Sequence, residues 1–206
     1  MPPSLLRILR PEDMPESLGC IIIGGEACPP DAVRRWAKHM NVINVYGPTE
    51  TTICTSLCPC DVDSWTRPLL GTAFGGVNYR VIDDELYIGG CQVARGYLNL
   101  PDLTARKFTT IDGMRFYRTG DRVRPLDNGD IEFIGRIDRQ FKLRGQLVEP
   151  DEIETQLQAC KGIRKAAVIK TAEPVQLIAY ITADKPVSES ALKSVSYTHL
   201  TLPTKA

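Results

Sequence analysis

The sequence predicts an α/β fold, in which short apolar strands alternate with helical segments. A first strand, Ile21–Ile23, runs into the loop Gly24–Glu26, and a second strand, Val42–Val45, ends at Tyr46–Glu50. The segment between them is helical, because a proline pair opens it and apolar residues follow at helical spacing. Strands that are joined by a helix and end in loops predict a mainly parallel sheet with ligand-binding loops at the carboxyl ends of its strands.

Two helices are expected in the first forty residues. One lies near residues 4–9, and the other begins at Pro29-Pro30, where proline is tolerated because the first amides of a helix have no partner within it. Val33, Trp36 and Met40 follow at helical spacing and form one apolar face.

From Gly71 to Gly145 the pattern changes to short strands separated by glycines, which predicts a β-rich segment. Asn128-Gly129 is a strong signal for a tight turn between two of these strands. The expected strands are Tyr79–Ile82, Leu86–Ile88, Val123–Leu126, Ile131–Ile134 and Gln140–Leu143.

A smaller α/β unit is expected to begin at Asp138. Apolar residues at helical spacing after Pro150 predict one short helix, and two further apolar runs predict strands that could pair. The residues are Ile153, Leu157 and Cys160 for the helix, and Ala166–Lys170 and Gln176–Ile181 for the strands. The expected domains are therefore residues 1–137 and 138–194, followed by a non-native tail, 195–206, which resembles translated adapter sequence.

Composition excludes several classes of protein. Twenty-five basic and 25 acidic residues cancel, so no basic field indicates a nucleic-acid partner. Apolar runs such as Cys20–Ile23 are far shorter than the roughly 20 residues that a membrane helix needs. The seven cysteines form no Cys-x-x-Cys pair, and with no secretory signal at the start this indicates a reduced, cytoplasmic chain.

The densest chemical motif is Asn44–Thr52, with the sequence NVYGPTETT. Gly47 and Pro48 fix a tight loop, and we expect its backbone amides and three hydroxyls to face outward, where they can hold phosphate oxygens. Glu50 would repel phosphate unless it held Mg²⁺. An ordinary Gly-Pro turn with a capping threonine explains the same residues equally well.

Two further motifs are individually ambiguous. In Tyr117–Asp121 an aspartate follows a Thr-Gly turn and could accept both hydroxyls of a ribose, or could bond its own backbone. The charges of Gly135–Gly145 could belong to a solvated strand face.

Taken together and in this order, the motifs resemble those of the adenylate-forming superfamily, most closely the adenylation domains of nonribosomal peptide synthetases. Two more segments match: Glu85–Gly90 with Ala94–Phe108, and Gln146–Glu154. The resemblance covers residues 5–194. It implies the carboxyl-terminal part of a large AMP-binding domain, with mixed sheets and a small β-rich subdomain, joined by a hinge to a small α+β domain.

Members of this superfamily use Mg-ATP to convert a carboxylic acid to an acyl-adenylate. By resemblance, Gly24, Gly25 and Glu26 would line the adenine. Asn44 would bond the adenine edge and Tyr46, followed by Gly47, would stack on its face. Asp121 would bind the ribose, and Phe133 stands where the family usually has a tyrosine that reaches the ribose.

The resemblance also implies the catalytic roles and the partners. Thr49 would contact phosphate, Glu50 would hold Mg²⁺, and Arg136 would approach ribose or phosphate. Asp138 would be the hinge for a second step, in which the acyl group passes to the phosphopantetheine thiol of a carrier protein. Arg144-Gly145 would face the pantetheine arm, and neighbouring synthetase domains would complete the assembly.

The side-chain pocket for the substrate would be lined by Ile22, Gly24, Val45, Ile53 and Cys54. These residues are small, apolar or weakly polar, which favours an amino acid or other small carboxylic acid with an uncharged side chain. Each could instead be core packing. A metal site at Cys54, Cys58 and Cys60 is disfavoured, since no histidine lies near them.

The resemblance leaves two alternatives open. The chain could belong to another adenylate-forming ligase, specific for acyl-CoA, aryl acids or D-alanyl carrier protein, or it could be a non-catalytic nucleotide-binding module. The family's phosphate loop and its catalytic lysine match no segment of this sequence. We therefore expect the chain by itself to be catalytically inactive.

Overall fold

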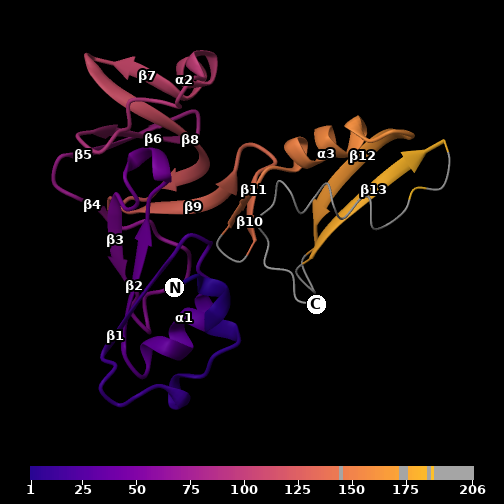
Figure 1. The fold of residues 1–206 in the computed structure, drawn as a ribbon. Helices are drawn as coiled ribbons and strands as arrows, with labels where there is room; N and C mark the ends of the chain where they lie inside the picture. The colour runs from indigo at the N-terminus through magenta and orange to yellow at the C-terminus, as the bar shows by residue number, and fades with distance from the viewer. Residues whose placement is uncertain (144–145, 172–175, 185–186, 188–206) are drawn as a thin grey trace. The chain divides into compact units, whose positions relative to one another are not determined.

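The computed structural model describes residues 1–143, 146–171, 176–184 and 187, and the chain divides into two compact units (Figure 1). The first unit is Met1–Asp138 and the second is Arg139–Ala206. The boundary expected between residues 137 and 138 lies next to this division. The expected tail, 195–206, and Arg144-Gly145 lie outside the described residues.

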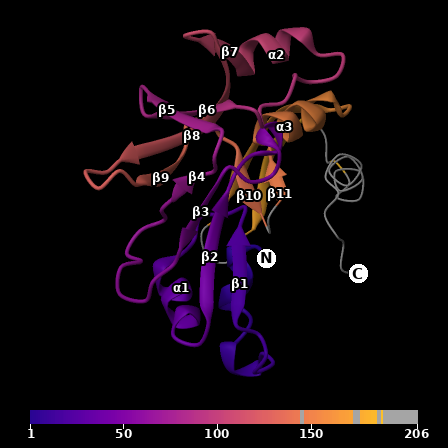
Figure 2. The same cartoon turned by 90° about the vertical axis from the view of Figure 1, so that its left-hand side faces the viewer.

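The first unit begins with a sheet whose strands are ordered β1-β2-β3-β4 (Figure 2). β1 (Cys20–Gly24) and β2 (Asn41–Tyr46) are parallel, as expected, but β3 (Ser56–Pro59) and β4 (Thr72–Ala73) are antiparallel to their neighbours. The prediction of a mainly parallel sheet is therefore wrong. After Tyr46 the chain makes one 3₁₀ turn and returns beside β2, where a parallel sheet would require a crossover helix.

Helices cover one face of this sheet. The helix expected near residues 4–9 is a short 3₁₀-helix, Pro3–Arg7, and a second one follows at Pro11–Asp13. α1 (Pro30–Ala37) begins at the predicted proline and ends before Met40. Trp36 is fully buried, and its indole Nε1 donates a hydrogen bond of 3.0 Å to the carbonyl of Leu6, so it joins α1 to the first helix.

The opposite face of the same sheet is apolar and open. Ile22 of β1 is 55% exposed and pairs with Ile43 of β2, and Leu57 of β3 is 39% exposed. Side chains alternate between the two faces of a strand, so the residues that flank Ile22 point into the core while Ile22 itself points away.

A second, antiparallel sheet completes the first unit, with the order β5-β6-β8-β7 and β9 paired to β8. α2 (Pro101–Lys107) precedes β7 and was not predicted as a helix. The expected turn at Asn128-Gly129 joins β8 to β9, and Gly129 has the positive φ that favours glycine there. The strands are β5 (Val77–Ile82), β6 (Glu85–Gly90), β7 (Phe108–Ile111), β8 (Met114–Pro125) and β9 (Ile131–Arg136).

In the second unit the predicted helix and paired strands are confirmed. α3 (Pro150–Ala159) buries Ile153 and Leu157. β12 (Ile163–Lys170) pairs in antiparallel fashion with β13 (Leu177–Ala183). A separate hairpin consists of β10 (Phe141–Leu143) and β11 (Gln146–Val148).

Arg139 connects the elements of the second unit. Its guanidinium donates hydrogen bonds to the carboxylates of Asp151 and Glu154 in α3 and to the carbonyl of Val168 in β12. Glu154 in turn accepts a hydrogen bond of 2.6 Å from the amide of Val168.

Among the described residues, none of the helices has the length and apolar character needed to cross a membrane.

Replacement of Trp36 should destabilise the first unit strongly. Trp36→Ala removes a fully buried ring and its hydrogen bond to Leu6, and truncation of a buried aromatic residue typically lowers the free energy of unfolding by about 3–5 kcal/mol. Urea denaturation followed by circular dichroism measures the change. Arg34→Ala, at an exposed position of the same helix, is the control and should change the free energy by less than about 0.5 kcal/mol. Equal effects of the two variants would contradict the packing described here.

Acid should weaken the second unit through Glu154. The hydrogen bond from Arg139 lowers the pKa of Glu154 below its ordinary value of 4.5, so the unfolded chain takes up this proton first as the pH falls. The ion pair therefore adds to the free energy of unfolding above the unfolded-state pKa, and its contribution is lost as the pH falls through the lower, folded-state pKa.

Glu154→Gln should accordingly flatten the pH dependence of the free energy of unfolding between about pH 6 and pH 3. Urea denaturation at a series of pH values measures it. Glu152→Gln, at an exposed position of the same helix, should leave the slope as in the wild type. An unchanged slope in Glu154→Gln would show that the pair contributes nothing to stability.

Candidate functional site

The loop after β2 is tighter than the sequence suggested. Residues Thr49–Thr51 form a 3₁₀ turn, in which the Thr51 hydroxyl donates to the carbonyl of Pro48 at 3.1 Å. The Thr52 hydroxyl donates to the carbonyl of Gln92 at 2.9 Å. The expectation that three hydroxyls face outward is therefore wrong, since two of them stabilise the loop. The side chain of Thr49 is exposed.

Gly47 is required by close packing inside this loop. A Cβ atom at this position would lie 2.6 Å from the carbonyl oxygen of Ile53 and 2.8 Å from the Cα atom of Cys54. The chain reverses over Gly47 through Thr52 and Ile53, which have φ values of 60° and 71°. Positive φ is unusual for β-branched residues and costs on the order of 1–3 kcal/mol each, so the loop is held in a strained conformation by its surroundings.

β8 is irregular where it passes Asp121. The sequence predicts a Thr-Gly turn, but Thr119 and Gly120 lie inside the strand, in a bulge where its register with β6 shifts. Gly120 has a φ of +70°, and its amide donates to the buried carboxylate of Glu85 at 3.0 Å instead of to a strand carbonyl. Glu85 also pairs with Arg118 at 3.0 Å. The bulge therefore depends on a side chain of the neighbouring strand.

The carboxylate of Asp121 lies at the centre of the site. Asp121 is 8% exposed, and Arg136 Nη1 donates to its Oδ1 atom at 2.9 Å. The hydroxyl of Tyr46 donates to its Oδ2 atom. β2, β8 and β9 thus each contribute one of these polar groups.

Arg136 extends the same network to the end of the first unit. Its guanidinium makes a bidentate pair with Asp138, at 2.9 and 2.6 Å, and donates to the carbonyl of Thr119 at 2.6 Å. A Cβ atom on Gly120 would lie 2.8 Å from Arg136 Nη2, so the glycine makes room for the guanidinium as well as for the bulge.

Burial and charge act together on these groups. Burial, followed by the negative charge of Asp121, raises the pKa of Tyr46 well above its ordinary value. Burial by itself would lower the pKa of Arg136, but its hydrogen bonds to Asp138 and the charge of Asp121 outweigh that effect and raise it. Tyr46 therefore stays a neutral donor and Arg136 a fixed cation throughout the physiological range.

Glu50 lies against the preceding part of β8. Its Oε1 atom accepts a hydrogen bond of 2.6 Å from the hydroxyl of Tyr97. Burial, followed by the charge of Glu50, raises the pKa of Tyr117, four residues before Asp121 along the strand. At one end of the loop Tyr46–Glu50 the Tyr46 hydroxyl bonds Asp121 of β8, and at the other end the charge of Glu50 acts on Tyr117 of the same strand.

The residues expected around adenine lie at the ends of β1 and β2. Gly24 packs closely, since a Cβ atom there would lie 2.5 Å from the carbonyl oxygen of Val45, whereas the space around Gly25 is open. Glu26 accepts a hydrogen bond of 3.0 Å from the amide of Ser4. Asn44 is buried, and its side chain bonds the thiol of Cys28 at 3.0 Å and the carbonyl of Leu69 at 2.9 Å.

Most of the residues expected in the substrate pocket are exposed or half-buried. Ile22 is 55% exposed and Ile53 is 77% exposed, while Val45 and Cys54 are half-buried. Phe133, expected near the ribose, packs with an apolar cluster that includes Leu70 and Val123.

The donor set fits Mg²⁺ that is shared with a substrate. Among the described residues, no cluster of three or more histidine, cysteine or acidic side chains could enclose a metal ion, and this includes the cysteines near residue 58. Mg²⁺ usually keeps several waters and binds one or two carboxylates together with phosphate oxygens. Glu50, with the exposed Thr49 beside it, suits that mode of binding.

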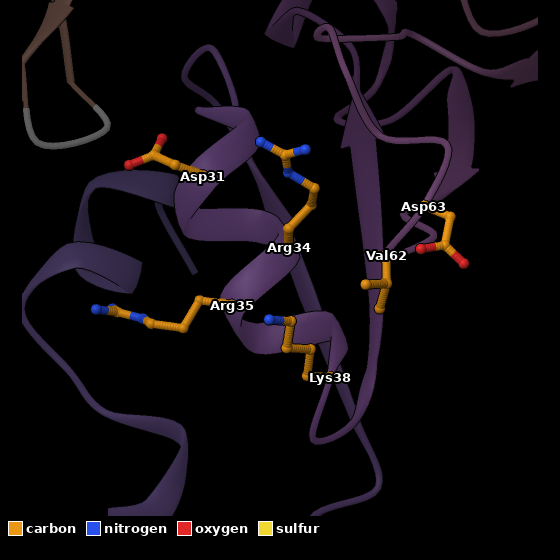
Figure 3. A pocket seen from close by; sticks show the side chains of 6 residues that line it. All are labelled: Asp31, Arg34, Arg35, Lys38, Val62 and Asp63. Atoms are coloured by element: carbon orange, nitrogen blue, oxygen red, sulfur yellow. The ribbon is translucent and has the colours of Figure 1, made fainter.

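A cavity of about 490 Å³ lies away from these motifs (Figure 3). It lies between α1 and the segment that contains Val62 and Asp63. None of its lining residues belongs to the motifs above, and its charged side chains of both signs are exposed, so it does not enlarge the site.

Sequence reasoning missed two side chains that organise the site, Glu85 and Tyr97. Both stand in the segments that carry the family resemblance, but neither received a role. A glutamate at the start of a strand gives no local sign that it will bond a bulge in the next strand. The contact between Tyr97 and Glu50 joins residues 47 positions apart and depends on the tertiary fold.

Known proteins with similar sequences support the family resemblance that the motifs indicate. The family model of AMP-binding enzymes matches residues 1–98. Bacitracin synthase 3 of Bacillus licheniformis is 41% identical over 183 residues, which cover 82% of this chain and 3% of that protein. The chain thus spans a small part of this relative.

Two solved structures are similar in fold. The adenylation domain AlmE of Vibrio cholerae, in complex with glycyl-adenosine-5'-phosphate, gives a TM-score of 0.84 at 26% identity and covers 96% of this chain and 43% of its own. NpsA-ThdA of Klebsiella oxytoca, an artificially fused adenylation–PCP di-domain, gives 0.80 at 26% identity and covers 97% and 42%. The chain therefore belongs to the AMP-binding, adenylate-forming superfamily, and it is similar to the adenylation domains of nonribosomal peptide synthetases.

Proposed function

We propose that the chain is part of an enzyme that activates an amino acid with Mg-ATP. The products of this step are an aminoacyl-adenylate and pyrophosphate, and the aminoacyl group then passes to the phosphopantetheine thiol of a carrier protein. The observation that carries the proposal is that both ends of the loop Tyr46–Glu50 interact with β8: Tyr46 bonds Asp121, and the charge of Glu50 acts on Tyr117.

The nucleotide would bind across the ends of β1, β2 and β8. Each oxygen of a carboxylate has two lone pairs, so Asp121 can accept bonds from ribose hydroxyls in addition to those from Tyr46 and Arg136. The bond from Tyr46 to Asp121 fixes the orientation of the tyrosine ring, and a fixed ring is a suitable surface for a base to stack on. The open space at Gly25 supports a role on the adenine side.

Adenylation is an in-line displacement at the α-phosphorus. An oxygen of the amino acid's carboxylate forms a bond to phosphorus, the bond to the bridging oxygen breaks, and pyrophosphate leaves. Glu50 would hold Mg²⁺, which neutralises charge on the phosphate oxygens when it is bound. Arg136 is a fixed cation beside the ribose site, and Thr49 offers an exposed hydroxyl donor. No general base is needed, because the attacking group is already a carboxylate.

The hinge would lie at Asp138. The first compact unit ends at this residue, and Arg136 holds its carboxylate to that unit. Hinges absorb large changes of φ and ψ at a few residues between rigid parts, which suits this position. The likeness to an adenylation–PCP di-domain supports a carrier-protein partner for the transfer step.

The substrate is proposed to be an amino acid with an uncharged side chain. Ile22, Val45 and Ile53, which the resemblance assigns to the substrate pocket, are apolar. The similarity to AlmE, whose structure holds glycyl-adenosine-5'-phosphate, favours an amino acid over an acyl or aryl acid.

Adenosine nucleotides should bind the chain through Asp121. Asp121→Asn removes the charge that accepts the ribose hydroxyls, and a hydrogen bond to a charged group contributes about 1.5–3 kcal/mol, so the affinity for AMP should fall by about tenfold or more. Isothermal titration calorimetry with AMP measures it. Asp127→Ala, at an exposed position of the β8–β9 turn, is the control and should bind as the wild type does. Equal affinity of Asp121→Asn and wild type would refute the ribose role.

The chain by itself should not catalyse amino-acid-dependent ATP–pyrophosphate exchange. Ile22 and Ile53 are more than half exposed, so the residues expected to line a substrate pocket do not enclose one. Exchange of radiolabelled pyrophosphate into ATP, measured with a mixture of amino acids, tests this. Exchange above a control without amino acids would overturn the expectation and would show that the chain is a complete catalyst.

A further inference from the structure

Tyr97 makes a directed contact with Glu50 that the proposed function does not use. The phenol hydroxyl lies 2.6 Å from Glu50 Oε1, a short distance of the kind found when the acceptor is ionised. Both side chains are half-buried, so the contact is partly shielded from water. Tyr97 follows β6, whereas Glu50 follows β2, and the two are brought together by the packing of two loops.

Those loops are joined at three further points. The amide of Ala94 donates to the carbonyl of Glu50 itself at 2.8 Å. The Thr52 hydroxyl bonds the carbonyl of Gln92 at 2.9 Å, and the Gln92 amide group bonds the carbonyl of Cys54 at 3.1 Å. The backbone of Glu50 is therefore fixed by the loop that carries Tyr97, independently of the contact between the side chains.

The ring and the backbone of Tyr97 are both fixed by contacts with neighbouring residues. It packs edge-on against Phe108, with ring centroids 5.6 Å apart, and Phe108 packs against Tyr117 at 5.1 Å. Phe108 and Tyr117 are each 5% exposed. The amide of Tyr97 also donates to the hydroxyl of Thr104 in α2 at 2.9 Å. The hydroxyl thus reaches Glu50 from a side chain with little freedom to move.

We infer that Tyr97 is a positioning residue for the metal-binding carboxylate, which it orients by holding Glu50 Oε1 at a fixed point. This inference rests on the proposed function, because it assumes that Glu50 holds Mg²⁺. A neutral phenol suits the task better than a lysine or an arginine would. It restricts the rotation of the carboxylate and leaves its negative charge available to the cation.

The energetic reason lies in the geometry that Mg²⁺ demands. Mg²⁺ requires near-octahedral coordination at about 2.0–2.1 Å, so a carboxylate that rotates freely must be ordered when the ion binds. A carboxylate that is already oriented avoids that cost. The single donated hydrogen bond is expected to change the affinity for the metal–nucleotide complex by about tenfold.

The test measures two affinities of the 206-residue chain. Electron paramagnetic resonance of Mn²⁺, titrated in the presence of ATP, gives the affinity for the metal complex, and calorimetry with metal-free AMP gives the affinity for the nucleotide alone. Tyr97→Phe keeps the ring and its contact with Phe108. It should weaken binding of Mn²⁺–ATP by about tenfold and leave binding of AMP unchanged. A purely structural role would weaken both.

Matched variants separate this inference from the function on which it rests. Glu50→Gln should weaken Mn²⁺–ATP at least as much as Tyr97→Phe. Glu50→Asp keeps the negative charge but moves the carboxylate away from the Tyr97 hydroxyl. It should therefore weaken binding of Mn²⁺–ATP as Tyr97→Phe does. Tyr180→Phe removes a hydroxyl from an exposed position of β13 and should have no effect.

The other outcomes distinguish an error in the inference about Tyr97 from an error in the metal role of Glu50. If Glu50→Gln weakens Mn²⁺–ATP while Tyr97→Phe and Glu50→Asp bind as the wild type does, the inference about Tyr97 is wrong and the metal role of Glu50 stands. Parallel loss of AMP and Mn²⁺–ATP binding in Tyr97→Phe also overturns it. If Glu50→Gln binds Mn²⁺–ATP normally, or the wild type does not bind it, the metal role of Glu50 fails and the inference fails with it.

Discussion

The negatively charged side chain of Asp121 is buried, since only 8% of the residue is exposed. A buried charge is stable when hydrogen-bonding or oppositely charged partners compensate for the loss of water. Arg136 and Tyr46 are those partners: Arg136 comes from β9, which pairs with β8, and Tyr46 comes from β2 of the other sheet. The position of this carboxylate therefore fixes the end of β2, the bulge in β8 and the last turn of chain before Asp138. Removal of one partner would leave a charge without compensation, so the three groups act as a unit.

The bulge in β8 determines where that carboxylate points. Gly120 turns the strand with a positive φ, and Glu85 replaces the ladder hydrogen bond that the turn removes. The same glycine leaves space for the guanidinium of Arg136. Beyond the bulge the strand pairs with β9, with a further shift of register between Arg122 and Val123. Gly120 thus permits both the bulge in β8 and the close approach of the Arg136 guanidinium.

Much of this fold was predictable where the signal is local. The turn at Asn128-Gly129, the proline at the start of α1 and the apolar periodicity of α3 each depend on a few adjacent residues, and each was predicted correctly. The antiparallel direction of β3 was not predicted, because it depends on the path of the chain after Tyr46. The hydroxyls of Thr51 and Thr52 were assigned to solvent, since their partners, Pro48 and Gln92, become apparent when the loop is folded. The motifs identified the superfamily, while the contacts of Glu85 and Tyr97 required tertiary structure.

The two tryptophans of the sequence, Trp36 and Trp65, both lie in the first unit, and each is almost completely buried. Intrinsic tryptophan fluorescence therefore reports the unfolding of Met1–Asp138 and contains no direct signal from the second unit. Far-ultraviolet circular dichroism responds to the helices and strands of both. A difference between the two denaturation curves would thus measure, without any label, whether the parts on either side of Asp138 unfold together or one after the other.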